Sequence, residues 1–486
     1  MSIKKGAVVE RFICVVHVKD TTALSLRDAI YSILVEYALS PTKIRGQGYD
    51  GASNMKGDSN GLKTLIMNET KSAYYIHCFA HQLQLTLVAV SKKKVDCGWL
   101  FELLSTMLNV VGGSCKRQEM LNESQTQLVP KAFEDGEIVS GKGLNQQLGL
   151  GRPGDTRWGS HYKLLLNVIV LHPAICEVLD MIFENPPNSD DRAKADRVGD
   201  ALMSFDFIFM VHLMKTIFGV ANQLNIALQK KDQDIVNAVS LVKLTKERLQ
   251  QMREDGWESL LTSVISFCDK RGISVPNMDE EYAHLGRKKR GNQQHVTNLY
   301  HFRVQVFLAI IDLQLQELNH QFDEVSMELL LCMTCLNPAN SFSSFDKSKL
   351  LRLAEFYPNE FSSFDLLCLE DELDNFIHDM QRDERFEGLK DIGELSKKLV
   401  ESTKHETYRL IYLLIKMVLI LPVATATVER AFSAMTIVKS KLRNSMGDQL
   451  LNDCLVTYIE KDVFLQISDD DILNRFQNMR TRREQL

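Results

Sequence analysis

Near the start of the chain, the spacing of apolar residues changes between the alternation typical of β-strands and the spacing typical of helices. The stretch AVVERFICVVHVK, from Ala7, alternates loosely and is rich in Val, Ile and Phe, which favours a β-strand. The next stretch, DTTALSLRDAIYSILVEYAL from Asp20, has apolar residues at helical spacing after residues that cap helices. A short strand then ends at Asp50, and a third runs to about Cys78 before helical spacing resumes. This alternation predicts an α/β part at the front of the chain.

Further along, the pattern becomes almost entirely helical. Helical stretches separated by polar breaks fill residues 99–396, and residues 397–486 contain strongly periodic helices. We therefore predict three parts, with boundaries at 1–98, 99–396 and 397–486. The most apolar run, LIYLLIKMVLILPV at residues 410–423, carries Lys416 and is shorter than a membrane span. We expect this run to be a buried helix and the protein to have no membrane partner.

Composition and charge narrow the class of protein. Of the 486 residues, 45% are hydrophobic, which is enough for buried cores and argues against a disordered chain. The formal net charge of −6 excludes a protein that grips nucleic acid through bulk positive charge, so any such contact must be local. The ten cysteines lack the close spacing of a disulfide framework, and the N-terminus lacks an apolar signal segment. We expect reduced, intracellular thiols.

The segment GQGYDGASNM concentrates glycines around one carboxylate, Asp50. Gly46, Gly48 and Gly51 have the spacing of a dinucleotide fingerprint, but the preceding TKIR is a poor buried strand and Asp50 would repel a pyrophosphate. An acid at a strand end with small neighbours is also what a divalent metal site needs. The structural alternative is an Asx turn built by Asp50 and Asn54. The residues alone leave the metal site and the turn open.

Four segments in order resemble the hAT family of transposases, in particular its zinc-finger-MYM-like and TTF-finger-associated branch. They are GQGYDGASNM, YYIHCFAHQLQLTL, DTRWGS, and the long stretch from LPVATATVERAFS to LVTYIEKDVF. The resemblance implies an RNase H-like domain interrupted by a large all-helical insertion and followed by a region through which family members dimerise. The expected fold class is α/β plus mostly α, with the RNase H-like domain truncated at its front.

The resemblance also implies the chemistry of the family, in which two aspartates and one glutamate hold two divalent metal ions for DNA cleavage. Asp50 matches the second aspartate and Glu429, in ATVERAFS, matches the glutamate. The first aspartate has no counterpart, because Asp20 and Asp28 stand at a helix start and inside a helix. We expect Asp50 and Glu429 to be vestigial, the protein to be no enzyme, and no cofactor to be bound. Mg²⁺ or Mn²⁺ would be held by Asp50 and Glu429 only in an active protein.

Two further readings remain open beside this inactive, dimerising protein. One is an active metal-dependent transposase or nuclease that recruits another acid, such as Asp20 or Asp58, into the site. The other is a helical scaffold that binds proteins and no DNA. In none of the three readings is a small molecule the substrate.

Two pairs of residues match family positions outside the acids. Cys78 and His81, in HCFAH, resemble a family pair near the active site, and we expect them to pack and form hydrogen bonds around Asp50. Arg157 and Trp158, in DTRWGS, resemble the Arg-Trp pair of the insertion. Such a pair can contact DNA through phosphate pairing and base stacking, while Trp158 is equally suited to anchor a core.

The C-terminal helices are the part that the resemblance covers most fully. They carry two apolar stripes that must be buried, against the chain itself or against a second copy. We expect a homodimer, with DNA as a second partner. The cluster GRKKRG, with basic residues 287–290, suits a nuclear localisation signal, so the nucleus is the expected location. The predicted dimerisation residues are Val428, Phe432, Leu450, Leu451, Leu455, Tyr458 and Ile459.

Overall fold

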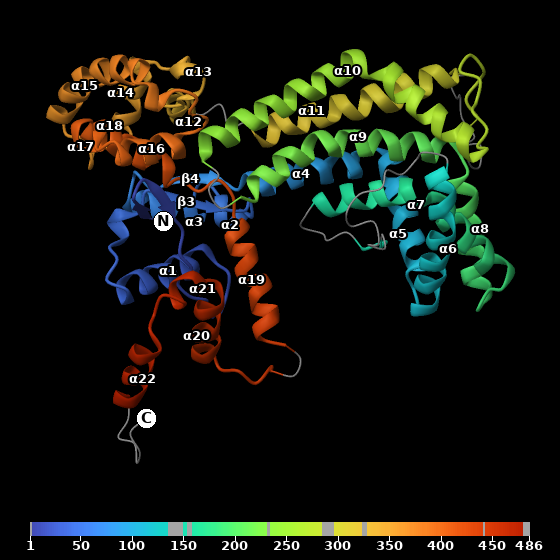
Figure 1. Ribbon diagram of the computed structural model, residues 1–486, viewed down its shortest axis with the longest axis horizontal. Helices are drawn as coiled ribbons and strands as arrows, with labels where there is room; N and C mark the ends of the chain where they lie inside the picture. Colours follow the sequence, from blue (N-terminus) through green and yellow to red (C-terminus); the bar gives the residue numbers. More distant parts are fainter. Residues whose placement is uncertain are drawn as a thin grey trace. The chain divides into compact units, whose positions relative to one another are not determined.

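The computed structural model describes residues 2–134, 149–152, 158–230, 234–283, 296–322, 328–440 and 443–479. Two units divide the chain (Figure 1). The first combines the front of the chain, residues 1–80, with residues 228–239 and 324–486, and the second contains residues 81–227 and 240–323. The fold class is as predicted: a small strand-containing part with helices, and a large helical insertion within it.

Two short strand pairs form the β-structure of the first unit. β1 (Ser2–Lys4) and β2 (Ala7–Val9) pair antiparallel. They are joined by a turn in which Gly6 has φ +77°, and a Cβ at Gly6 would meet the backbone of Lys397 at 2.7 Å. β3 (Gly46–Tyr49) and β4 (Tyr74–His77) pair parallel. The predicted order of strands and helices is confirmed. β1, which the sequence pattern did not predict, pairs with the start of the first predicted strand.

Helices complete the first unit on both sides of the insertion. The front holds α1 (Ala23–Glu36), η1 (Pro41–Lys43), α2 (Ser53–Lys56) and α3 (Leu62–Glu69). After the insertion come α12 (Glu328–Thr334), α13 (Ala339–Phe342), α14 (Lys347–Glu355), α15 (Ser363–Arg382), η4 (Glu384–Phe386), α16 (Ile392–Glu401), α17 (Lys404–Thr407) and α18 (Arg409–Leu419). The chain ends with α19 (Ala426–Val438), α20 (Asp448–Ile459), α21 (Lys461–Phe464) and α22 (Asp469–Asn478).

The residues after β2 do not continue the predicted strand. Their backbone is instead bound by side chains of the C-terminal helices: the N–H of Phe12 donates to Glu460 at 2.6 Å, and the N–H of Val15 donates to Asn452 Oδ1 at 2.7 Å. Asn452 Nδ2 returns a bond to the carbonyl of Val15 at 2.8 Å. Phe12 and Val15 also pack against the cluster formed by α19 and α20. These contacts give partners to two N–H groups and one carbonyl of the segment without a neighbouring strand.

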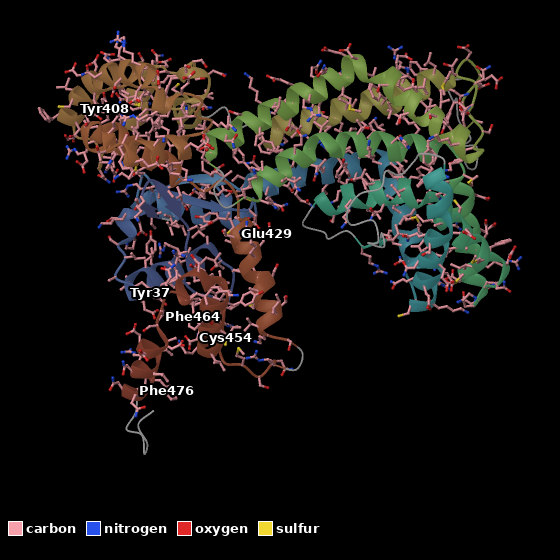
Figure 2. All side chains as sticks on the ribbon, viewed as in Figure 1. Tyr37, Tyr408, Glu429, Cys454, Phe464 and Phe476 are labelled. Atoms are coloured by element: carbon pink, nitrogen blue, oxygen red, sulfur yellow. The ribbon has the colours of Figure 1, made fainter. Side chains whose placement is uncertain are left out.

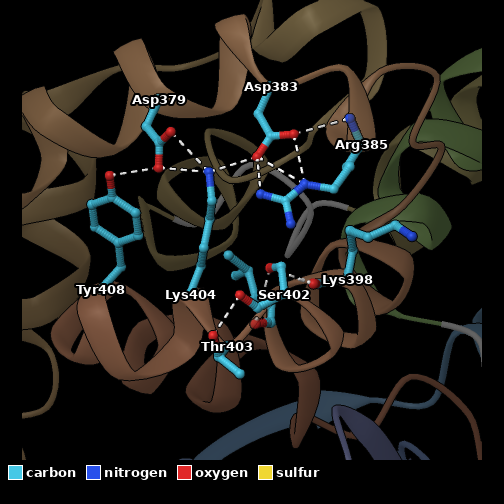
Figure 3. A network of polar contacts seen from close by, with 9 residues as sticks. Asp379, Asp383, Arg385, Lys398, Ser402, Thr403, Lys404 and Tyr408 are labelled. Atoms are coloured by element: carbon cyan, nitrogen blue, oxygen red, sulfur yellow. Dashed lines mark hydrogen bonds and ion pairs between the residues drawn. The ribbon is translucent and has the colours of Figure 1, made fainter.

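A charged network ties the helices before α18 together (Figure 3). Lys404 Nζ lies 2.8 Å from Asp379 Oδ2 and 2.7 Å from Asp383 Oδ2. Arg385 binds the same Asp383 at 2.6 Å, and the hydroxyl of Tyr408 donates to Asp379 at 2.8 Å. The end of α15 is thereby fixed to the start of α18.

The second unit is a set of long helices. They are α4 (Phe79–Lys93), whose first residues belong to the first unit, α5 (Val95–Val111), α6 (Cys115–Glu134), α7 (Trp158–Glu184), α8 (Ser189–Leu202), α9 (Phe205–Leu228), α10 (Ile235–Arg271), the π-helix η2 (Tyr300–Leu308) and α11 (Ala309–Gln321). Two segments, Gly159–Glu184 and Phe205–Leu228, are long and apolar enough to cross a membrane. Over half of each is buried within the protein, as in core helices of globular proteins. The apolar run at 410–423 forms α18, as expected, with Ile411, Leu414 and Ile415 fully buried.

Candidate functional site

The candidate site lies at the carboxyl end of the parallel pair β3 and β4. Asp50 directly follows β3, and the N–H of Cys78, directly after β4, donates to the carbonyl of Tyr49 at 3.0 Å. The hydroxyl of Tyr75 donates to the backbone carbonyl of Asp50 at 3.1 Å. These bonds continue the strand pairing by one residue, so both strand ends are held together at Asp50.

The glycines around Asp50 have a packing role. A Cβ at Gly48 would meet the ring of Pro422 at 2.7 Å, and one at Gly46 would meet the same ring at 2.9 Å. A Cβ at Gly51 would meet the imidazole of His77 at 2.8 Å. Only glycine leaves room for such close approach. These glycines therefore give room to Pro422 and His77.

The segment with Pro422 returns the chain to the strand ends. The carbonyl of Val423 accepts from the N–H of Phe79 at 3.0 Å. The sulfur of Cys78 accepts from the N–H of Thr425 at 3.2 Å and also lies 3.2 Å from its hydroxyl. Thr425 precedes α19, so these contacts fix where the helix of Glu429 begins. Cys78 was expected to form hydrogen bonds around Asp50; the partner that its sulfur has here is Thr425.

The two candidate carboxylates stand in different surroundings. Asp50 is exposed, and its Oδ1 accepts from the N–H of Ala52 at 3.2 Å, which makes an Asx turn. Asn54, the other residue expected in that turn, donates instead to the carbonyl of Thr21 at 2.7 Å. Glu429 is half-buried in the first turn of α19, where a negative charge is favoured by the helix dipole (Figure 2). The structure thus brings the residue at the end of β3 and the start of the helix of Glu429 to the same end of the strand pair.

The remaining acids at the front have structural partners. Asp20 accepts from the hydroxyl and the N–H of Thr22, the residue that caps α1, and these bonds lower its pKa. Asp28 pairs with Arg27 at 2.7 Å and Asp58 with Lys63 at 2.7 Å. Each of these acids therefore has a local role that accounts for it.

The described residues do not fit a pair of metal ions. Within them, no group of three or more His, Cys, Asp or Glu side chains is arranged to hold a metal. Two-metal chemistry needs several carboxylates that converge on both ions. Asp50 and Glu429 alone do not supply that set.

A cavity of about 180 Å³ lies within the first unit beside the start of α19. Glu10 lines it and accepts from the hydroxyl of Thr427 at 2.8 Å. Asp234, 6% exposed, also lines it; burial raises its pKa to about 6, and the charge of Asp391 adds to that rise. The sequence pattern did not predict that Glu10 and Asp234 line one cavity, because they come from distant segments. The sequence does show that Asp234 directly precedes a long helical pattern, which is typical of a helix cap.

Three predicted site residues lie elsewhere or beyond what the structure describes. His81 is half-buried in α4 and belongs to the second unit. Arg157 lies outside the described residues, as does the basic cluster 287–290. Trp158 begins α7, and its side chain is likewise outside what the structure describes.

The predicted dimerisation residues separate into two groups. Leu451 and Leu455 are buried in a cluster with Ala434 and Val438, so α19 and α20 cover each other there. Ile459 packs against that cluster. The other four are half or more exposed, on α19 and α20: Val428 50%, Phe432 55%, Leu450 55% and Tyr458 51%.

The fold and site define a class of protein, an RNase-like domain interrupted by helices. Comparison with known families agrees at both ends of the chain. Residues 2–61 match the family described as the ZMYM1/FAM200 RNase-like domain, and residues 372–463 match the hAT family C-terminal dimerisation region. Over these segments the chain is hAT-transposase-like. Asp50 lies within the first match and Glu429 within the second.

Proposed function

We propose that this chain is a transposase-derived protein that acts as a homodimer through its C-terminal helices and does not cleave DNA. The observation that carries the proposal is the exposed apolar surface of α19 and α20, formed by Val428, Phe432, Leu450 and Tyr458 within the matched dimerisation region. Their chemistry suits an interface, since aromatic and aliphatic side chains are the usual anchors. A second copy is the occupant that the match favours.

The inactive part of the proposal has its own support. The described acids do not converge as a metal pair would require, and Asp50 is engaged in a turn with Ala52. For the remaining roles we propose a nuclear protein that associates with DNA through Arg157 and Trp158. The sequence motifs GRKKRG and DTRWGS support these roles.

The solution mass of the purified chain, measured by light scattering across a dilution series, tests the dimer. We expect a dimer whose dissociation constant rises at least about 100-fold in Phe432→Asp, because a charge would then be buried in the interface. Phe364→Asp is the matched control. Phe364 is 73% exposed on α15 and lies outside the matched region, so its substitution should leave the mass unchanged. A monomer at all concentrations would refute the proposal.

An active nuclease is the second candidate, favoured by the convergence of Asp50 and the start of α19 at one end of the strand pair. It predicts Mg²⁺- or Mn²⁺-dependent nicking of plasmid DNA that Asp50→Asn abolishes. Our proposal predicts no nicking above the background of the Asp50→Asn and Glu429→Gln variants. If the parent protein nicks DNA and both variants lose that nicking, the protein is an active nuclease and the proposal is refuted.

A further inference from the structure

A cavity of about 600 Å³ lies within the second unit. Three helices of that unit, α4, α5 and α7, supply most of its lining (Figure 1). The lining residues of α5 stand at positions i, i+3, i+4, i+7 and i+8, which places them along one side of the helix. They are Phe101, Leu104, Ser105, Leu108 and Asn109. The volume falls within the roughly 300–1,000 Å³ that is usual for small-molecule pockets, so the chemistry of the lining indicates the kind of ligand.

One part of the lining is apolar. Leu104 and Leu164, which are 1% and 4% exposed, form an apolar floor. Phe101 also lines the cavity, and its ring stacks on Phe218 with the centroids 6.1 Å apart and meets the ring of His161 edge to face at 5.8 Å. Because these two rings hold Phe101 in one orientation, it can stack on a planar ligand with little further loss of conformational entropy.

The charged side chains of the lining are cations. Among the described residues that line the cavity they are Lys92, on α4, and Arg152, and none is a carboxylate. Arg152 donates to Oδ1 of Asn109 at 2.5 Å. Since that partner is a neutral amide, the bond orients the guanidinium without neutralising its charge. A locally cationic cavity in a chain of formal net charge −6 favours an anionic ligand, and Arg and Lys are common contacts of phosphate.

Amide and hydroxyl groups complete the lining. Gln84 and Ser91 of α4 line the cavity together with Ser105 and Asn109 of α5. Amide side chains both donate and accept hydrogen bonds, which suits them to the edge of a nucleobase. An aliphatic anion such as a fatty acid makes no use of these groups. A stacking ring, amides and cations in one cavity therefore favour a base that carries a phosphate.

We propose that this cavity binds a nucleotide, with the phosphate beside Lys92 and Arg152 and the base against Phe101 and the apolar floor. The ligand chemistry is that of a nucleoside monophosphate, which enters either as a free nucleotide or as one unit of a single DNA strand. The site needs neither Arg157 nor Trp158, the residues proposed above for DNA association. It is independent of the proposed dimer, because its lining belongs to the second unit, whereas α19 and α20 belong to the first.

The first test measures binding of dAMP to the full chain by isothermal titration calorimetry at low salt. We expect saturable binding to a single site per chain. Deoxyadenosine lacks the phosphate and deoxyribose 5-phosphate lacks the base, so each should bind at least about tenfold more weakly than dAMP. Absence of dAMP binding at millimolar concentration would overturn the proposal, as would equal affinities for dAMP and deoxyribose 5-phosphate.

The second test assigns the two parts of the ligand to residues. Lys92→Gln should weaken dAMP binding about tenfold and leave deoxyadenosine binding unchanged, because only the phosphate contact is lost. Phe101→Leu should weaken both dAMP and deoxyadenosine about fivefold or more and leave deoxyribose 5-phosphate unchanged, because stacking is lost.

Lys163→Gln is the matched control. Lys163 is exposed on α7, the helix of His161 and Leu164, and it is not among the residues that line the cavity. It should bind dAMP like the parent. Lys92 is exposed as well, so its substitution should leave the melting temperature unchanged and keeps the test valid if Phe101→Leu lowers it. Equal weakening by Lys92→Gln and Lys163→Gln would indicate attraction by general surface charge and overturn the proposed site.

A third measurement separates the two sources of the nucleotide. A short fluorescein-labelled strand of deoxyadenylates is titrated by fluorescence anisotropy at the salt used for dAMP. Strand binding at least about tenfold tighter than that of dAMP, displaced by dAMP and weakened by Phe101→Leu, assigns the cavity to a nucleotide within a strand. Weaker strand binding, or strand binding that dAMP does not displace, assigns it to the free nucleotide. The solution mass should be the same for Lys92→Gln and the parent, so failure of the nucleotide site leaves the proposed dimer intact.

Discussion

Two C-terminal helices of the same unit, α18 and α22, differ in how far their apolar side chains are exposed. Along α18, Leu414, Ile415 and Val418 have no exposed surface. Along α22 no residue is buried, and Ile472 and Met479 remain open to solvent. Both helices are strongly amphipathic by sequence, so amphipathicity alone does not distinguish a helix that completes a core from one that leaves its apolar side chains exposed.

α20, which lies between them in the sequence, is intermediate in exposure. α20 buries Leu451 and Leu455 against α19 but exposes Leu450 and Tyr458. The helix is therefore only partly covered within the chain, since Leu451 and Tyr458, seven residues apart, lie along the same side of it. The degree of internal cover falls from α18 to α22, and the proposed interface lies on α19 and α20, which are partly covered.

The largest expected effect concerns α18, the helix whose apolar side chains are buried within the chain. Leu414→Ala removes a fully buried side chain from α18 and should lower the free energy of unfolding of the first unit by about 2–5 kcal/mol, through lost burial and the cavity left behind. Leu367→Ala, 68% exposed on α15, should cost less than about 0.5 kcal/mol. Urea denaturation followed by circular dichroism measures both. Equal losses would show that the core does not depend on α18 as described.

A second prediction concerns the buried carboxyl group of Asp234. The pKa of Asp234 in the folded state is about 6, above its ordinary value of 3.8, chiefly because burial disfavours the charged form. The folded state therefore binds the proton more tightly, and this group stabilises the fold at low pH. Its contribution is lost as the pH rises from about 4 through about 6.

Asp234→Asn should remove that pH dependence and raise the free energy of unfolding at pH 7 by about 2–3 kcal/mol. Asparagine keeps an oxygen to accept from the N–H of Asn237, so the cap of α10 is retained. Chemical denaturation at pH 4.5 and pH 7 measures the difference. Identical pH profiles for the two proteins would show that Asp234 is charged and solvated in the fold.

The sequence predicted the local order of elements well, because that order depends on spacing and caps. The strands that end at Tyr49 and His77 and the buried helix at 410–423 follow from periodicity. The use of the glycines around Asp50 could not be read from the sequence, since it depends on Pro422, far along the chain. The same holds for Cys78, whose partner Thr425 is 347 residues away. Contacts of such separation leave no periodic signal.

The front segment shows the same limit and supplies the smallest effect. VVERFICVV reads as one strand, but after Val9 its backbone is bound by side chains of α20, chiefly Asn452, whose amide both accepts from and donates to Val15. Asn452→Ala removes both bonds and should cost about 1–2 kcal/mol. Because the segment covers part of α20, its release should also speed proteolysis near Arg11, measured by mass spectrometry. Gln449→Ala, exposed on the same helix, is the control. If both variants are cleaved like the parent, packing of Phe12 and Val15 holds the segment, and the cover of α20 is apolar and not polar.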